Sequence, residues 1–259
     1  MNFKYIFGVI LSIPLLPLMY FQGKKIKASV PELPEAKGIK GSTTNANSKK
    51  TLNLLTIGES TIAGVGVKTH EEGFTGTLAK ELSSRLSTNV DWKVYARSGY
   101  TARRVHQKII PKIQESHADI IVVGLGGNDA FTLNRPNTWR KDMSMLITAL
   151  KLKFPFATIV FCNMPPIKEF PAFTPLIKFV IGNLVELLGK ELNEIVQKYD
   201  NVYYIDEVIT LQRWIKKMKI EAPKSAFFSD GVHPSKLAYQ TWAKDMANTI
   251  YNDKLVQKN

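Results

Sequence analysis

Three residues of this 259-residue chain are of the types that together carry out nucleophilic catalysis. Ser60 follows an apolar run that is typical of a buried strand, and His233 lies three residues after Asp230. A serine hydroxyl is a weak nucleophile and needs a base within hydrogen-bonding reach. If folding brings His233 to Ser60, the imidazole supplies that base. Asp230 then orients the ring and stabilises the imidazolium, as in a Ser-His-Asp triad.

Acyl transfer also needs hydrogen-bond donors around the oxyanion of its tetrahedral intermediate. The chain offers the backbone N–H groups of Ser60 and Gly99 and the side-chain amide of Asn128. Glycine at position 99 allows close backbone approach. Each motif also has a structural alternative, because serine caps helices well and short Asp- and Asn-containing segments often form turns. Their joint occurrence after strands favours the catalytic interpretation.

Apolar runs and helical periodicity predict the elements that position these residues. The strands are expected at 52–57, 91–96, 119–125, 157–162 and 201–205, and the helices at 74–86, 102–114, 139–152, 176–199 and 235–251. This alternation predicts an α/β fold, with a five-stranded parallel sheet of flavodoxin type covered on both faces. Ligands bind beyond the carboxyl ends of such strands, so we expect Ser60, Gly99 and Asn128 to meet at one edge.

The N-terminus predicts association with a membrane. Residues 5–21 form an uncharged apolar run that Lys24, Lys25 and Lys27 follow. A cleaved signal peptide, an uncleaved anchor and a helix lying in the membrane interface all remain open. The anchor is favoured because small residues at a cleavage site are poorly represented. We therefore divide the chain into an anchor or signal segment (1–27), a polar linker rich in proline and glycine (28–50) and one catalytic domain (51–259).

Composition narrows the classes of partner. The formal net charge is +13, but the lysines are scattered and no nucleic-acid motif is present, so attraction to a membrane surface explains the charge better. The single cysteine, Cys162, excludes an intrachain disulfide. The sequence contains no paired-cysteine or His-x-x-x-His metal motif. A glycine-rich stretch at 64–69 lacks the second glycine of a phosphate-binding loop.

With these motifs in place, the chain resembles the SGNH/GDSL hydrolases over residues 52–250. The four marker residues of that family fall on Ser60, Gly99, Asn128 and His233, and Asp230 completes the triad. The resemblance implies a three-layer αβα fold and hydrolysis of esters or thioesters without a metal or organic cofactor. The segments 162–166 and 227–235 also resemble a bacterial branch of the family whose members carry a hydrophobic N-terminus.

One residue departs from the family pattern. Glu59 stands where the family usually has aspartate before the serine. In the family this carboxylate mainly braces the loop, so we expect the extra methylene to alter geometry or rate without abolishing activity. A catalytically silent protein is the alternative.

The substrate is expected to be a lipid or small acyl ester. The loop 164–175 follows the fourth predicted strand and contains four prolines with Ile167, Phe170 and Phe173. It is predicted to form one lip of an acyl pocket, or else to pack on its own domain. The alternatives in function are an esterase that removes O-acetyl groups from a cell-envelope glycan and a module that binds lipid or sugar without turnover.

Overall fold

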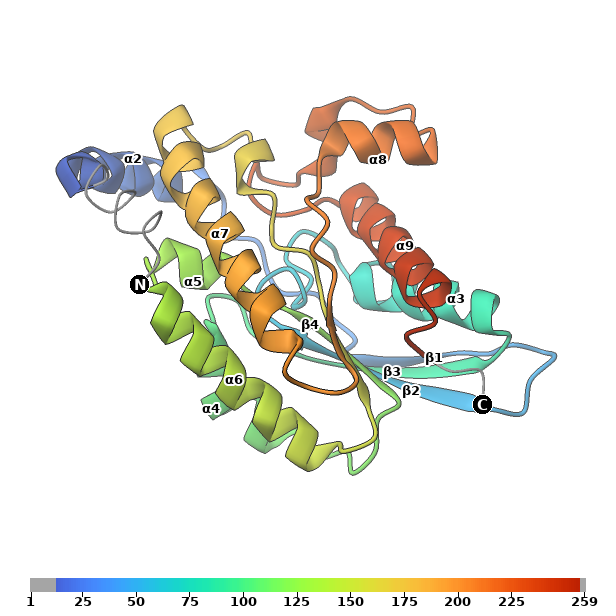
Figure 1. Ribbon diagram of the computed structural model, residues 1–259. Coiled ribbons are helices and arrows are strands. Elements are labelled where there is room, and N and C mark those ends of the chain that lie inside the picture. The colour runs from blue at the N-terminus through green and yellow to red at the C-terminus, as the bar shows by residue number, and fades with distance from the viewer. Residues whose placement is uncertain (1–12, 257–259) are drawn as a thin grey trace.

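The computed structural model describes residues 13–256, and a six-stranded sheet lies at its centre (Figure 1). The strand order is β1-β3-β2-β4-β5-β6, and β2 to β6 run parallel. The order of the five parallel strands confirms the predicted flavodoxin type. The strands are β1 (Lys40–Thr43), β2 (Thr51–Gly58), β3 (Asn89–Ala96), β4 (Ile120–Gly124), β5 (Thr158–Phe161) and β6 (Val202–Tyr204).

Helices cover both faces of the sheet and complete the expected three layers (Figure 1). One face carries α4 (Ala102–Lys108), α5 (Gly127–Phe131), α6 (Pro136–Lys153) and α7 (Pro175–Val196), with the 3-10 turns η2 (Ile110–Lys112) and η3 (Ile167–Glu169). The other carries α3 (Phe74–Leu86), α8 (Leu211–Met218) and α9 (Lys236–Asn252), with η4 (Lys224–Phe227).

Strand β4 shows why its apolar run folds as a central strand. Ile121 and Val123 enter the core under α6 and α7, whereas Ile120 and Val122 enter the core under α3 and α9. All four side chains are fully buried. A strand that is covered on both faces has a continuous apolar sequence, so it can be predicted without an alternation of apolar and polar residues.

The sheet has one strand more than the five predicted. Residues 40–43, which we assigned to a linker, form β1 and pair antiparallel with β3, with Lys40 opposite Lys93. This edge strand alternates between exposed and half-buried positions and contains no apolar run. The sequence pattern used for buried strands therefore does not detect it.

The helices differ from the prediction at three points. The helix expected over 102–114 ends at Lys108 and continues as the 3-10 turn η2 around Pro111, which has no N–H for a helical bond. The short helices α5 and α8 were not predicted. Helix α8 spans about two turns and buries two apolar side chains, Leu211 and Trp214, so it is too short to be distinguished from a loop by its periodicity.

The N-terminal segment is described from Ile13, in η1 (Ile13–Leu15) and α2 (Leu16–Ser29). Residues 1–12 of the predicted anchor lie outside the described part of the chain. Within residues 13–256, no helix combines the length and apolar character needed to cross a membrane. Helix α2 lies beside the first turns of α7 and near α5 (Figure 1).

Candidate active site

Ser60 stands at the carboxyl end of β2, on a turn that the sheet holds tightly. A Cβ atom on Gly58 would lie 2.2 Å from the carbonyl oxygen of Gly124, so pairing of β2 with β4 up to their last residues requires glycine there. The N–H of Glu59 donates to the same carbonyl at 3.1 Å. Turns follow Ser60, and the next helix begins at Phe74. The alternative role of Ser60 as a helix N-cap is therefore wrong.

Asp230 and His233 form the second half of the site, in the loop that precedes α9. The side chain of Asp230 is buried, and one of its carboxylate oxygens lies 2.7 Å from Nδ1 of the His233 ring. Its other oxygen accepts backbone N–H groups of Val232 at 2.8 Å and His233 at 2.6 Å. One carboxylate thus fixes both the ring and the backbone that carries it.

The charge state of Asp230 suits this role. Burial acts against the charged form, but the hydrogen bonds from the His233 ring and from the two backbone N–H groups outweigh it. Together they hold the pKa of the Asp230 carboxyl below its usual value. An ionised carboxylate on Nδ1 leaves Nε2 of the imidazole free to act as a base.

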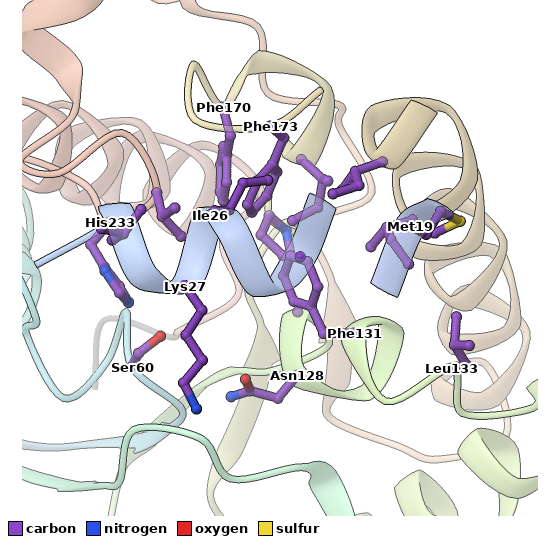
Figure 2. A pocket seen from close by; sticks show the side chains of 18 of the residues that line it. Met19, Ile26, Lys27, Ser60, Asn128, Phe131, Leu133, Phe170, Phe173 and His233 are labelled. Carbon is purple, nitrogen blue, oxygen red and sulfur yellow. The ribbon is translucent and has the colours of Figure 1, made fainter. Parts of the chain in front are cut away.

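Figure 2 shows the His233 ring directed toward Ser60, and both side chains line the same cavity. Asn128 lines that cavity as well, from the first turn of α5. Its side-chain amide donates one hydrogen bond to the carbonyl of Tyr100 at 3.1 Å. The same amide also interacts with the carboxyl group of Glu59, whose pKa it lowers. The structure therefore brings Ser60, Asn128 and His233 to one cavity.

Gly99 lies in the turn to which Asn128 is bound. Its φ of +77° is in the left-handed region that favours glycine. A Cβ atom at this position would meet no other protein atom within 4 Å. Within the protein, backbone conformation and not crowding is thus what requires glycine here.

Two buried carboxylates fix the position of α5, the helix that carries Asn128. Glu59 accepts the backbone N–H groups of Gly127 and Asn128, both at 2.9 Å, and so fixes the start of α5 to the serine turn. Asp129 accepts the N–H of Ala102 at 2.9 Å and thereby ties α5 to the start of α4. Glu59 thus braces the loop as the family pattern implied. No role was predicted for Asp129, although it directly follows the candidate oxyanion donor Asn128.

Burial raises the pKa of both carboxyl groups. It moves the pKa of Glu59 to about 7, and the backbone N–H groups of Asn128 and Gly127 counteract part of that shift. It also moves the pKa of Asp129 to about 6, although the hydrogen bonds from Ala102 and Asn134 act in the opposite direction. Both carboxyl groups therefore have a pKa above the ordinary value of a carboxyl group.

A third carboxylate comes from the segment predicted as a linker. Glu35 accepts the N–H of Ser98 at 2.7 Å and pairs with Arg97 at 3.2 Å, directly before Gly99. No motif in the sequence marks this residue, because its partners lie more than sixty positions away.

The cavity that contains these groups has a volume of about 620 Å³ and is mainly apolar. Ile167, Phe170 and Phe173 line it and also pack in the core, so the 164–175 loop forms one wall of this cavity, while its role as the lip of an acyl pocket stays a prediction. Helix α2 forms another wall, which the sequence did not reveal. Met19 of α2 is buried in the same core as Phe173, and Gln22 accepts a hydrogen bond from Thr174 at 2.6 Å.

Comparisons with known proteins agree with this geometry. Residues 56–241 match the model of the GDSL-like lipase/acylhydrolase family. The match spans well over half of the chain, and the protein belongs to this family, whose members are hydrolases acting on esters. No match is found among curated protein sequences.

Solved structures with the same fold include lipases and esterases. The lipase Lip_vut3 from a goat rumen metagenome aligns with a TM-score of 0.58 at 18% identity, covering 80% of this chain and 100% of its own. TesA gives a TM-score of 0.58 at 17% identity, covering 79% and 99%. A family 3 carbohydrate esterase from Clostridium thermocellum gives 0.56 at 18% identity, covering 80% and 98%. At these identities the similarity establishes the fold alone.

Proposed function

We propose that the protein is a serine hydrolase that cleaves carboxylic esters or thioesters with the triad Ser60, His233 and Asp230. The observation that carries the proposal is the shared cavity of Ser60, Asn128 and His233, together with the bond between Asp230 and the His233 ring. Membership of an ester-hydrolase family supports the same reaction.

In the proposed reaction, Ser60 Oγ attacks the acyl carbon while His233 takes the hydroxyl proton. The N–H groups of Ser60 and Gly99 and the amide of Asn128 stabilise the oxyanion. The acyl–oxygen bond breaks, and the imidazolium protonates the leaving alcohol. Water then attacks the acyl-enzyme with His233 again as base, which releases the acid and restores the serine.

Within the predicted class of lipid or small acyl esters, the apolar cavity favours the longer acyl chains and disfavours an O-acetylated glycan. Phe170 and Phe173 are buried at its wall, with ring centroids 5.4 Å apart, and present a continuous apolar surface. Phe131 packs against Phe173 at 5.4 Å and extends that surface. An acetyl group would leave most of it in contact with water.

We further propose that the N-terminal segment associates with a membrane of the cell envelope. The apolar run is followed by Lys24 and Lys25, and α2 exposes Leu18, Tyr20 and Phe21. Exposed apolar side chains next to lysines are typical of contact with an anionic bilayer. Fractionation of cells should place the full-length protein with membranes, and protease accessibility would identify the face. Recovery in the soluble fraction would contradict this part.

Turnover of p-nitrophenyl esters by the full-length protein and by Ser60→Ala tests the catalytic proposal. Wild type should hydrolyse a medium-chain ester, and Ser60→Ala should lose activity by roughly three orders of magnitude or more. A preference for acetyl esters would favour the O-acetyl esterase instead. Absence of turnover, with retained binding of lipid or sugar, would indicate a silent binding module.

A further inference from the structure

Lys27 of α2 lies at the reacting end of the cavity. In Figure 2 its side chain descends from the helix between Ser60 and Asn128, and all three residues line the same cavity. Lys24 and Lys25 belong to the same helix but do not line it. One of three neighbouring lysines is therefore directed to the site where chemistry is expected.

Helix α2 is held in the orientation that this requires. Met19 is buried in the core, Gln22 accepts the hydrogen bond from Thr174, and Ile26 packs partly buried against the same core. These three residues lie on successive turns of α2, and Lys27 follows Ile26 directly. The side chain of Lys27 remains exposed, so its ammonium can reach a ligand without first breaking a buried contact.

The charge of Lys27 is not balanced by the other lining residues. The carboxylate of Glu59 is engaged with the N–H groups of Gly127 and Asn128, and the ring of His233 is engaged with Asp230. Lys27 forms no ion pair and no side-chain hydrogen bond with any of residues 13–256. A cation beside the nucleophile, in an otherwise apolar cavity, is suited to an anionic group of the substrate.

The apolar residues of the cavity indicate whether that anion belongs to the acyl part or to the alcohol part of the ester. In Figure 2, Lys27 ends between Ser60 and Asn128, whereas Met19 and Leu133 lie farther from Ser60, so the apolar part of the cavity extends beyond Lys27. The acyl chain fits this apolar part. The alcohol part of the ester then remains near Ser60 and Lys27.

We propose that Lys27 is a specificity residue that binds an anion carried by the alcohol part of the substrate. This inference rests on the proposed hydrolase function and names its substrate class, which is an acyl ester whose alcohol bears a phosphate or carboxylate. Water cleaves the bond between acyl carbon and ester oxygen. The fatty acid and the anionic alcohol leave, and the phosphate or carboxylate is chemically unchanged.

Three soluble hexanoyl esters test the proposal on the full-length protein without a lipid interface. They are 1-hexanoylglycerol, which is neutral, 1-hexanoylglycerol 3-phosphate and the hexanoyl ester of lactic acid, which carries a carboxylate. The measured quantity is the ratio of kcat/KM for each anionic ester to that for the neutral ester. Comparing the two anionic esters distinguishes phosphate from carboxylate.

The ratio should fall by roughly tenfold in Lys27→Gln, because a charge-assisted hydrogen bond in a partly exposed site is lost. It should fall further in Lys27→Glu, where like charges repel. Lys24→Gln and Lys25→Gln are matched controls, since they remove the same charge from the same helix outside the cavity. Their ratios should match that of wild type, and 0.5 M salt should reduce the wild-type ratio.

An unchanged ratio in Lys27→Gln, or an equal fall in the control variants, would overturn the assignment. A rise in kcat/KM for all three esters would also overturn it, because Lys27 would then obstruct the site. Binding of 1-hexanoylglycerol 3-phosphate to Ser60→Ala, with and without Lys27→Gln, separates this inference from the proposed function. Weaker binding in the double variant supports the role of Lys27 even if wild type turns over no ester. Equal binding contradicts it.

Discussion

The two halves of the site are built in different ways. Ser60 and Asn128 stand on turns at the ends of β2 and β4, and the buried carboxylate of Glu59 joins those turns. Asp230 and His233 lie in a loop between η4 and α9, where their own local hydrogen bonds fix them. The sheet thus orients the proposed nucleophile and oxyanion donors, whereas a short local motif orients the proposed base.

The carboxylates of the two halves differ accordingly. Burial raises the pKa of Glu59 to about 7, whereas hydrogen bonds hold the pKa of Asp230 below its usual value. A carboxylate that stabilises an imidazolium must stay ionised, while one that joins two turns needs only to accept hydrogen bonds. Carboxylates therefore serve a proposed catalytic role in one half of the site and a structural role in the other.

The largest expected effect comes from breaking the contact between the halves. Ser60→Ala and His233→Ala should each lower kcat on a medium-chain ester by roughly 10³-fold or more. The double variant should be no worse than either single variant, because nucleophile and base act as a unit. Steady-state kinetics at pH 8 provide the measurement, with circular dichroism as the folding control. Multiplicative losses would show that the two residues act separately.

Asn128→Ala should weaken the stabilisation of the oxyanion without affecting the proposed base, His233. Loss of one oxyanion donor costs about 2.7–4 kcal/mol, which corresponds to a fall in kcat of roughly 10²- to 10³-fold. The backbone N–H that Glu59 accepts is retained, but the hydrogen bond to the Tyr100 carbonyl is lost, so the free energy of unfolding should fall by about 1 kcal/mol. Asn252→Ala, at the exposed end of α9, is the control. A change confined to KM would indicate that Asn128 binds substrate in the ground state only.

The pH dependence of stability should report on Glu59. Its carboxyl has an ordinary pKa of 4.5 and a folded-state pKa of about 7. Between these values the folded protein retains a proton that the unfolded chain has lost, so the free energy of unfolding falls as pH rises. The contribution, on the order of 3 kcal/mol, is present below pH 4.5 and lost above about pH 7.

Urea denaturation from pH 5 to pH 8 measures this dependence. Glu59→Gln should remove the corresponding part of the slope, and Glu221→Gln, at an exposed position, should not. An identical slope in Glu59→Gln and wild type would mean that Glu59 is ionised throughout this range. Asp129, with a pKa of about 6, contributes to the slope in the same direction and would remain in both proteins.

The smallest effect is expected from removing Glu35, whose carboxylate binds the backbone beside Gly99 from outside the parallel strands. Glu35→Ala removes the acceptor for Ser98 N–H and the partner of Arg97, both beside the Gly99 turn. Because this pair is partly exposed, kcat should fall by no more than about threefold, and salt should mask part of the loss. Glu32→Ala, on the same segment and exposed, should match wild type. A loss of kcat as large as that in Asn128→Ala would mean that Glu35 is needed to position the oxyanion donors.

The sequence predicted that Ser60, Gly99 and Asn128 follow strand ends, because the residues that mark those ends are neighbours in the chain. Apolar runs ending before Ser60, Gly99 and Asn128 indicated strand ends, and parallel topology indicated that these ends meet. The antiparallel strand β1 was missed because it is polar and stabilised by its neighbour alone. The role of Asp129 depends on a partner twenty-seven residues away, and that of Glu35 on one more than sixty away. No local pattern contains such information.

The position of α2 shows the same limit. Its apolar and basic composition indicated a membrane segment, but nothing in it indicated that Met19 packs in the core beside the catalytic cavity. That contact depends on the surfaces of η3 and α7, which exist only in the folded protein. The wall that α2 contributes to the cavity, and with it the position of Lys27, could therefore not be predicted from the sequence.

The most direct test of the proposed triad is covalent labelling of the serine. A fluorophosphonate reacts with a serine that a neighbouring base activates, and mass spectrometry of the peptides identifies the residue. Wild type should carry one adduct, on Ser60, and His233→Ala should react slowly or not at all under the same conditions. Labelling of a different serine, or equal labelling of Ser60 in the absence of His233, would contradict the account.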